Sequence, residues 1–158
     1  MKIHSLLHGS LLIEELSRAR AFYEGVLGLL PSPERPDMSF EGVWYALGAQ
    51  QIHLICLPSP EKGLLRPAHG GRDRHVALGV DSVEALARRL DAAGISYTRS
   101  QSGRAALFCR DPDDNALEFI EAPVAGRSAD AAPAEQGWPP QARRQARESS
   151  SLSKATKR

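Results

Sequence analysis

The chain has 158 residues, of which 42% are hydrophobic and 25% are charged, and its formal net charge is +1. This length suits one globular domain or two small fused units, and the balanced charge argues against a whole-chain nucleic-acid or anionic-membrane binder. No apolar run approaches the roughly 18–20 residues that cross a bilayer, and the first residues make a poor signal peptide. Because Cys56 and Cys109 are the only cysteines and lie in apolar runs, we expect a reduced, cytoplasmic chain.

The first part of the chain shows a strand, a helix and further strands. A strand is predicted over residues 6–13, and apolar residues spaced by three and four then predict a helix over 16–27. Gly28 follows at the position of a C-terminal cap. Short apolar runs at 43–47 and 51–57 predict two more strands with a tight turn between them.

The same order recurs after a linker at 58–73 that is rich in Pro and Gly. Asp81-Ser82 supplies an N-terminal cap for a second helix, and Gly94 ends it. We interpret the pattern as one unit used twice, strand, helix and three strands, in modules of about 1–57 and 74–121 that together make a domain over 1–121. The elements predicted in the second module are a strand at 75–80, a helix at 83–93, strands at 95–99, 105–110 and 116–121, and a turn at 111–115.

The composition changes near residue 122. Residues 122–158 are dominated by Ala, Pro, Ser, Gln and Arg, and they carry seven basic and three acidic residues, a net charge of +4. Such a segment buries too little apolar surface to offset its ordering entropy, so a disordered basic tail is predicted. An alternative is a regulatory role in which this tail engages a partner.

The repeat places four potential metal ligands at matching positions. His8 and His75 lie on the opening strands of the two modules, and His53 and Glu118 lie on the closing strands. Equivalent positions of two related units can meet across a pseudo-twofold axis. Three imidazoles and one carboxylate would then bind one divalent ion, namely zinc, nickel, iron, cobalt or manganese.

Each of these residues also has a structural interpretation. A lone histidine in an apolar strand is more often a hydrogen-bonded core or edge residue than a ligand, and Glu118 alternates with apolar neighbours as a solvent-facing residue would. His4 and His69 lie outside the paired strand positions, so we expect them to be solvated and to have no part in metal binding.

Several of these segments resemble the vicinal oxygen chelate superfamily, which includes glyoxalase I, extradiol dioxygenases and bleomycin-binding proteins. The resemblance implies an α+β fold in which two βαβββ modules form a curled mixed sheet around a metal-containing cleft. In the turn at 111–115, Asp114 stands where the family usually has Gly, and we expect the turn to form nevertheless because Asp tolerates positive φ. The segments that carry the resemblance are 8–13, 22–29, 52–54, 74–78 and 110–118.

At several positions this chain differs from particular members of the superfamily, and these differences make some of their functions less suitable for it. Extradiol dioxygenases tend to carry a catalytic Tyr ten residues before the Glu ligand, where this chain has Phe108. Bleomycin-binding members usually lack the metal ligands that this chain retains. Glyoxalase I recognises glutathione through an Arg and an Asn, and this chain has Leu12 and Leu57 at those positions. The resemblance therefore fixes the metal site better than it fixes the substrate.

We predict a divalent-metal-dependent, glyoxalase-like enzyme of the lyase or isomerase type that acts on a small oxygenated metabolite. The alternatives are an extradiol-type dioxygenase or a non-catalytic protein that binds a drug or antibiotic. By similarity to glyoxalase I, Glu118 would be a ligand and, if displaced, the catalytic base. A homodimer without nucleic-acid or membrane partners is expected, with the modules pairing within or between chains. The candidate substrate-binding residues are Arg74, Arg104, Ser102 and Trp44.

Overall fold

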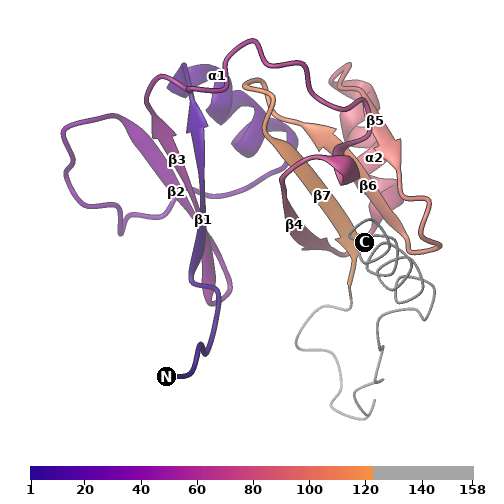
Figure 1. Ribbon diagram of the computed structural model, residues 1–158, viewed down its shortest axis with the longest axis horizontal. Helices are drawn as coiled ribbons and strands as arrows, with labels where there is room; N and C mark the ends of the chain where they lie inside the picture. Colours follow the sequence, from indigo (N-terminus) through magenta and orange to yellow (C-terminus); the bar gives the residue numbers. More distant parts are fainter. Residues whose placement is uncertain (123–158) are drawn as a thin grey trace, which may run out of the picture. The chain divides into compact units, whose positions relative to one another are not determined.

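The computed structural model of the protein describes residues 1–122, and it forms two sheets with helices packed against them (Figure 1). In chain order the elements are β1 (His8–Ile13), α1 (Leu16–Arg20), the π-helical segment η1 (Ala21–Val26), β2 (Gly42–Leu47), β3 (Gln50–Cys56), the 3-10 turn η2 (Gly70–Arg72), β4 (His75–Val80), α2 (Val83–Ala92), β5 (Tyr97–Arg99), β6 (Ala106–Arg110) and β7 (Ala116–Glu121).

The two sheets are built to one plan. The first has the strand order β1-β3-β2 and the second has the order β4-β7-β6-β5. In each sheet the opening strand pairs in parallel with the last strand of its module, as β1 does with β3 and β4 with β7, and the other pairs are antiparallel. The predicted mixed α+β fold with a repeated unit is therefore confirmed, and β1 corresponds to β4 as β3 does to β7.

The repeat is incomplete in the first module, which corrects the prediction of three strands after each helix. Between η1 and β2 the chain makes an isolated bridge between Pro31 and Tyr45 and no strand. Proline has no N–H to donate to a ladder, and Pro31, Pro33 and Pro36 crowd this segment. The three-stranded first sheet is the result.

The helix ends follow the predicted capping residues. Ser82 accepts a hydrogen bond from the backbone N–H of Ala85 at 3.2 Å, and Gly94 follows α2 with φ of +68°. The first predicted helix divides into α1 and η1, because the N–H of Leu27 bonds the carbonyl of Phe22 five residues earlier. Gly28, with φ of +77°, ends this segment.

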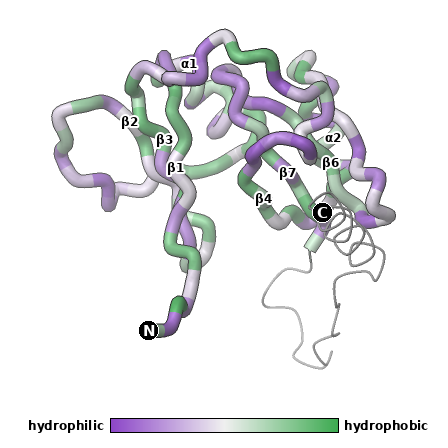
Figure 2. Tube along the Cα trace, in the orientation of Figure 1, coloured by the Kyte–Doolittle hydropathy of each residue, from purple (hydrophilic) through white to green (hydrophobic). Residues whose placement is uncertain are grey.

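Apolar side chains on one face of each sheet pack with the helices into one core. Figure 2 shows hydrophobic stretches along the strands of both sheets. Within this core the Tyr23 hydroxyl donates to the Asp111 carboxylate at 2.8 Å. Burial raises the pKa of both side chains, and the Asp111 charge raises that of Tyr23 further. The largest fully buried side chains are Tyr23, Tyr45, Ile13, Ile52, Leu54, Leu90, Leu107, Leu117 and Val83.

The predicted turn at 111–115 joins the two modules. Asp114 has φ of +64°, which confirms that Asp occupies the left-handed position of this turn. The side-chain amide of Asn115 donates to the carbonyl of Leu12 at 2.9 Å, and the N–H of Glu14 donates to the Asp113 carboxylate at 3.2 Å. The turn before β7 therefore holds the end of β1.

No helix among residues 1–122 is both long and apolar enough to cross a membrane. Apart from Ala122, the basic tail predicted at 122–158 lies outside the described residues.

Candidate metal centre

His75 and Glu118 form one pair of candidate ligands, with donor atoms in direct contact. The Nε2 atom of His75 lies 3.1 Å from Oε2 of Glu118, and Glu118 is only 5% exposed. Metal–ligand bonds of about 2.0–2.2 Å place neighbouring donor atoms roughly 3 Å apart, so this pair fits two positions around one divalent ion. The other ring nitrogen of His75 donates to the carbonyl of Asp73 at 2.9 Å.

His8 and His53 form the second pair, on the first sheet. Their rings stack with centroids 4.2 Å apart, and Trp44 stacks on the opposite face of His53 at 3.8 Å. The Nε2 atom of His53 lies 2.8 Å from Oε1 of Gln51. As donors these imidazoles suit a divalent ion, but here they stack face to face, and one nitrogen is engaged by an amide.

The four predicted ligands therefore fall into two pairs. Each pair joins the opening strand of a module to its last strand, and the two pairs lie on different sheets. Among residues 1–122, no three side chains of His, Cys, Asp or Glu come together as a metal-binding group.

The environment of His53 opposes its protonation. Burial lowers the pKa of the imidazole below its ordinary value, and the neighbouring His8 lowers it further. His53 is thus held neutral, which is the form that binds a metal ion.

We expect the metal-free protein to lose stability between pH 7 and pH 5 in part through His53. The unfolded chain takes up the proton at about pH 6.5 and the folded chain only at lower pH, so the contribution is present above the unfolded pKa and lost as pH falls. Urea unfolding at both pH values measures this loss. In a His53→Gln variant the loss should be smaller; an equal loss in both proteins would contradict the prediction.

The structure corrects the expectation that His69 is solvated. Its Nδ1 lies 2.7 Å from the Thr98 hydroxyl, and its ring meets Phe108 edge-on with centroids 4.8 Å apart. His75 meets the same Phe108 ring edge-on at 5.5 Å. Gly70 is buried against Phe108, and a Cβ there would lie 3.0 Å from the phenylalanine. The linker thus covers the strand beside Glu118.

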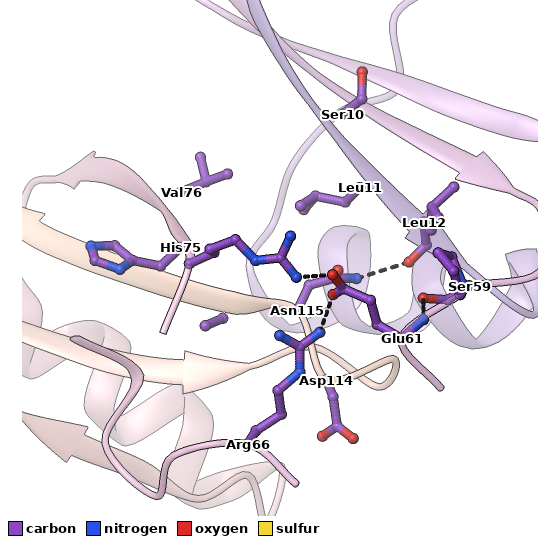
Figure 3. A pocket seen from close by; sticks show the side chains of 13 residues that line it. Ser10, Leu11, Leu12, Ser59, Glu61, Arg66, His75, Val76, Asp114 and Asn115 are labelled. Carbon is purple, nitrogen blue, oxygen red and sulfur yellow. Dashed lines mark hydrogen bonds and ion pairs between the residues drawn. The ribbon is translucent and has the colours of Figure 1, made fainter. Parts of the chain in front are cut away.

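The candidate substrate contacts lie in different places. Arg74 pairs with Glu61, which also pairs with Arg66, in a pocket of about 310 Å³ bordered by His75 (Figure 3). Figure 3 shows Arg66 and Glu61 facing each other, with the His75 ring turned away from them. Trp44 lines a separate pocket of about 810 Å³ with His8 and His53.

Arg104 is the candidate substrate contact that lies beside a candidate metal ligand, Glu118. Its guanidinium lies 3.7 Å from Oε1 of Glu118, and its Nε donates to the Ser102 hydroxyl at 3.4 Å. Ser102 is exposed and exchanges a hydrogen bond with Ser100. Cys109 is buried as expected, and burial raises its thiol pKa to about 12, so it is not a nucleophile near neutral pH.

Three partners of the candidate ligands were not found from the sequence. The contact of Gln51 with His53 could have been predicted, since Gln51 lies two residues from His53 on the same strand and therefore on the same face of the sheet. The contact of His75 with the carbonyl of Asp73 could not have been predicted, because any residue type supplies a backbone carbonyl. The stacking of Trp44 on His53 could not have been predicted either, because it depends on the register between two strands.

Comparisons of the sequence with a family model and with curated proteins point to the same superfamily. The model of the Glyoxalase/Bleomycin resistance protein/Dioxygenase superfamily matches residues 4–119. Glyoxylase I 4 of Arabidopsis thaliana is 31% identical over 124 residues, which cover 75% of this chain and 71% of that protein. Lactoylglutathione lyase of Salmonella typhimurium is 31% identical over 129 residues, 77% of this chain and 96% of the enzyme.

Solved structures share the fold at lower identity. A lactoylglutathione lyase from Agrobacterium tumefaciens superimposes with a TM-score of 0.56 at 23% identity, covering 79% of this chain and 98% of that one. TnmS3, an antibiotic binding protein from Streptomyces sp. CB03234, does so with a TM-score of 0.59 at 20% identity, covering 78% and 99%. The same fold thus serves an enzyme and a binding protein.

Proposed function

Because the chain belongs to the Glyoxalase/Bleomycin resistance protein/Dioxygenase superfamily, we propose that it is a divalent-metal-dependent enzyme of the lyase or isomerase type. Its substrate is a small oxygenated metabolite. The observation that carries this proposal is the pair formed by His75 Nε2 and Glu118 Oε2 at 3.1 Å on neighbouring strands. A divalent ion held there would polarise a substrate carbonyl.

Glu118 has the surroundings of an acid–base group. Its carboxylate is almost fully buried, with His75 at one oxygen and the Arg104 guanidinium at the other. When displaced from the metal ion, it would accept a proton from a substrate carbon and return it to a neighbouring position, while Arg104 would hold the negative charge of the substrate in place. Phe108 and the linker over it exclude water from one side of this carboxylate.

The complete ligand set in this proposal is His8, His53, His75 and Glu118. Since the two pairs lie on different sheets of one chain, a second copy completes the site when the first sheet of one chain faces the second sheet of its partner. This arrangement makes the protein a homodimer with two metal sites.

A mixing experiment tests this arrangement. His8→Ala and Glu118→Ala chains should each bind no metal tightly as homodimers. When the two are unfolded together and refolded at equal amounts, about one quarter of the sites should be intact, because half of the dimers are mixed and each has one unmutated site. Metal content per chain, measured after gel filtration, reports the recovery.

The control is the same mixture prepared without unfolding, which should recover no sites if exchange of chains is slow. Absence of recovery after refolding, in a mixture shown by mass spectrometry to contain mixed dimers, would mean that each site belongs to one chain. A mass of one chain in light scattering would contradict the dimer itself.

The substrate is proposed to lack a glutathionyl group. Leu12 and the exposed Leu57 offer no charged or amide group to a glutathione carboxylate. Arg74, Arg104, Ser102 and Trp44 remain the proposed contacts for a smaller anionic or polar molecule. Incubation of the metal-loaded protein with lactoylglutathione and with small hydroxy- and oxo-acids, followed by NMR, tests this choice; turnover confined to lactoylglutathione would reverse it.

A binding protein is the second candidate. It is favoured by the larger pocket of about 810 Å³ beside Trp44, where flat aromatic surface is available to a ligand, and by the fold shared with an antibiotic binding protein. Metal analysis separates the two, because a protein that only sequesters a small molecule has no need for four convergent ligands.

A further inference from the structure

His75 sits between two hydrogen-bond acceptors. Its Nδ1 lies 2.9 Å from the carbonyl oxygen of Asp73, and its Nε2 lies 3.1 Å from Oε2 of Glu118. A carbonyl oxygen can only accept, so Nδ1 must carry a proton in this arrangement. With Nδ1 protonated, Nε2 is the nitrogen whose lone pair can bind a metal ion that Oε2 of Glu118 binds as well.

The position of the Asp73 carbonyl is set by arginines around the Asp73 side chain. Arg110 donates to Oδ2 at 2.9 Å and Arg66 donates to Oδ1 at 3.2 Å, while the N–H of Arg74 also donates to Oδ1 at 2.8 Å. The Asp73 side chain is 9% exposed. A partly buried carboxylate held by three donors has little freedom, so its backbone carbonyl has little as well.

Arg110 connects this aspartate to two further segments. The guanidinium donates to the carbonyl of Pro67 at 2.9 Å and to that of Asp114 at 2.8 Å. One planar side chain on β6 thus contacts the linker at Pro67, Asp73 two residues before β4, and the turn before β7. The guanidinium contacts Asp73 and Asp114, which each lie two residues before the strands that carry His75 and Glu118. It is therefore placed to set the relative position of these two strands.

We propose that Arg110 is a positioning residue for His75, acting through the carboxylate and carbonyl of Asp73 to hold Nδ1–H and so present Nε2 beside Glu118. The inference goes beyond the ligand set and rests on the proposed function only in taking His75 as a ligand. Lysine could not replace Arg110, because a single ammonium cannot span three acceptors with the geometry of a guanidinium.

The test uses the full chain without metal and then with zinc. In the metal-free protein, ¹⁵N-edited NMR should detect an Nδ1 proton of His75 that exchanges slowly with water. Arg110→Gln should abolish this protection, and zinc affinity should fall by about 10–100-fold, as is usual when an outer partner of a ligand is removed. Asp73→Asn, which keeps the shape of the side chain, should act in the same direction.

Arg89→Gln is the matched control. Arg89 also donates to two backbone carbonyls, those of Val26 and Leu27, but it does not touch the Asp73 carboxylate. It should leave both the Nδ1 proton of His75 and zinc affinity unchanged.

Combining the substitutions guards against a variant that is merely unstable. Arg110→Gln added to Asp73→Asn should have little further effect on Nδ1–H exchange, since both act on one path. An Nδ1 proton that stays protected in folded Arg110→Gln would overturn the proposal. If protection depends on Arg110 but the parent protein binds no zinc, the positioning role stands and the proposed metal function fails.

Discussion

Glu118→Gln is expected to cost the protein its metal and its activity together. The amide keeps the shape of the side chain but removes the negative charge and the proton-accepting oxygen beside His75. We expect divalent-metal affinity to fall by more than about 100-fold, beyond the usual cost of losing an outer partner. Turnover of the substrate, once identified, should fall by about 10²–10⁴-fold because the acid–base group is lost.

Calorimetric titration with zinc and elemental analysis measure the first effect. Glu84→Gln, the same substitution on the exposed face of α2, is the control and should change neither metal binding nor turnover. A Glu118→Gln protein that kept both metal and full turnover would show that Glu118 is neither a ligand nor the base. His4→Ala and His69→Ala remain expected to preserve metal affinity, although His69 contacts Phe108.

The largest expected effect on stability comes from Asp111→Ala. This carboxylate accepts the Tyr23 hydroxyl, the N–H groups of Asp113 and Asn115, and the side-chain amide of Asn115, all within 2.9 Å. Alanine leaves these partly buried donors without an acceptor. We expect the free energy of unfolding in urea at pH 7 to fall by roughly 3 kcal/mol.

Two further variants, both with smaller expected losses of stability, serve as comparisons. Tyr23→Phe removes one hydrogen bond and should cost about 1 kcal/mol, since Asp111 keeps its other partners. Asp37→Ala, at an exposed position between η1 and β2, should leave the free energy of unfolding nearly unchanged. A loss below about 1 kcal/mol for Asp111→Ala would show that water replaces the missing carboxylate.

Local pattern was enough to predict most of the fold. The strands at 75–80 and 116–121 agree residue for residue with β4 and β7, because alternating and continuous apolar runs reflect burial on a sheet. Gly28 and Ser82 mark helix ends through their own backbone and side-chain chemistry. The absence of a third strand in the first module could also have been predicted from the prolines at 31–36, which disfavour strand pairing. The prediction of three strands instead followed the pattern of the second module.

The site was less accessible to sequence reasoning. The repeat placed His8 and His75 on equivalent opening strands and His53 and Glu118 on equivalent closing strands, but it did not predict that contacts would form within each module, between His8 and His53 and between His75 and Glu118. It could not predict how far apart the pairs lie, because that depends on how one sheet sits against another. Likewise, Arg110 and Asp73 are 37 positions apart and meet only after β6 and the linker have packed.

The turn that joins the modules also has a consequence for the order of folding. Its bonds to Leu12 and Glu14 close loops of 103 and 99 positions, whereas the contacts inside each sheet span far shorter stretches. Closing such long loops carries a larger entropic cost than closing the shorter loops inside each sheet, so we expect these bonds to form after both sheets have formed. During synthesis we therefore expect the three strands of the first sheet to emerge from the ribosome before Asn115 has been added to the chain. Until the second module is complete, β1 lacks the hydrogen bond from Asn115 to the carbonyl of Leu12.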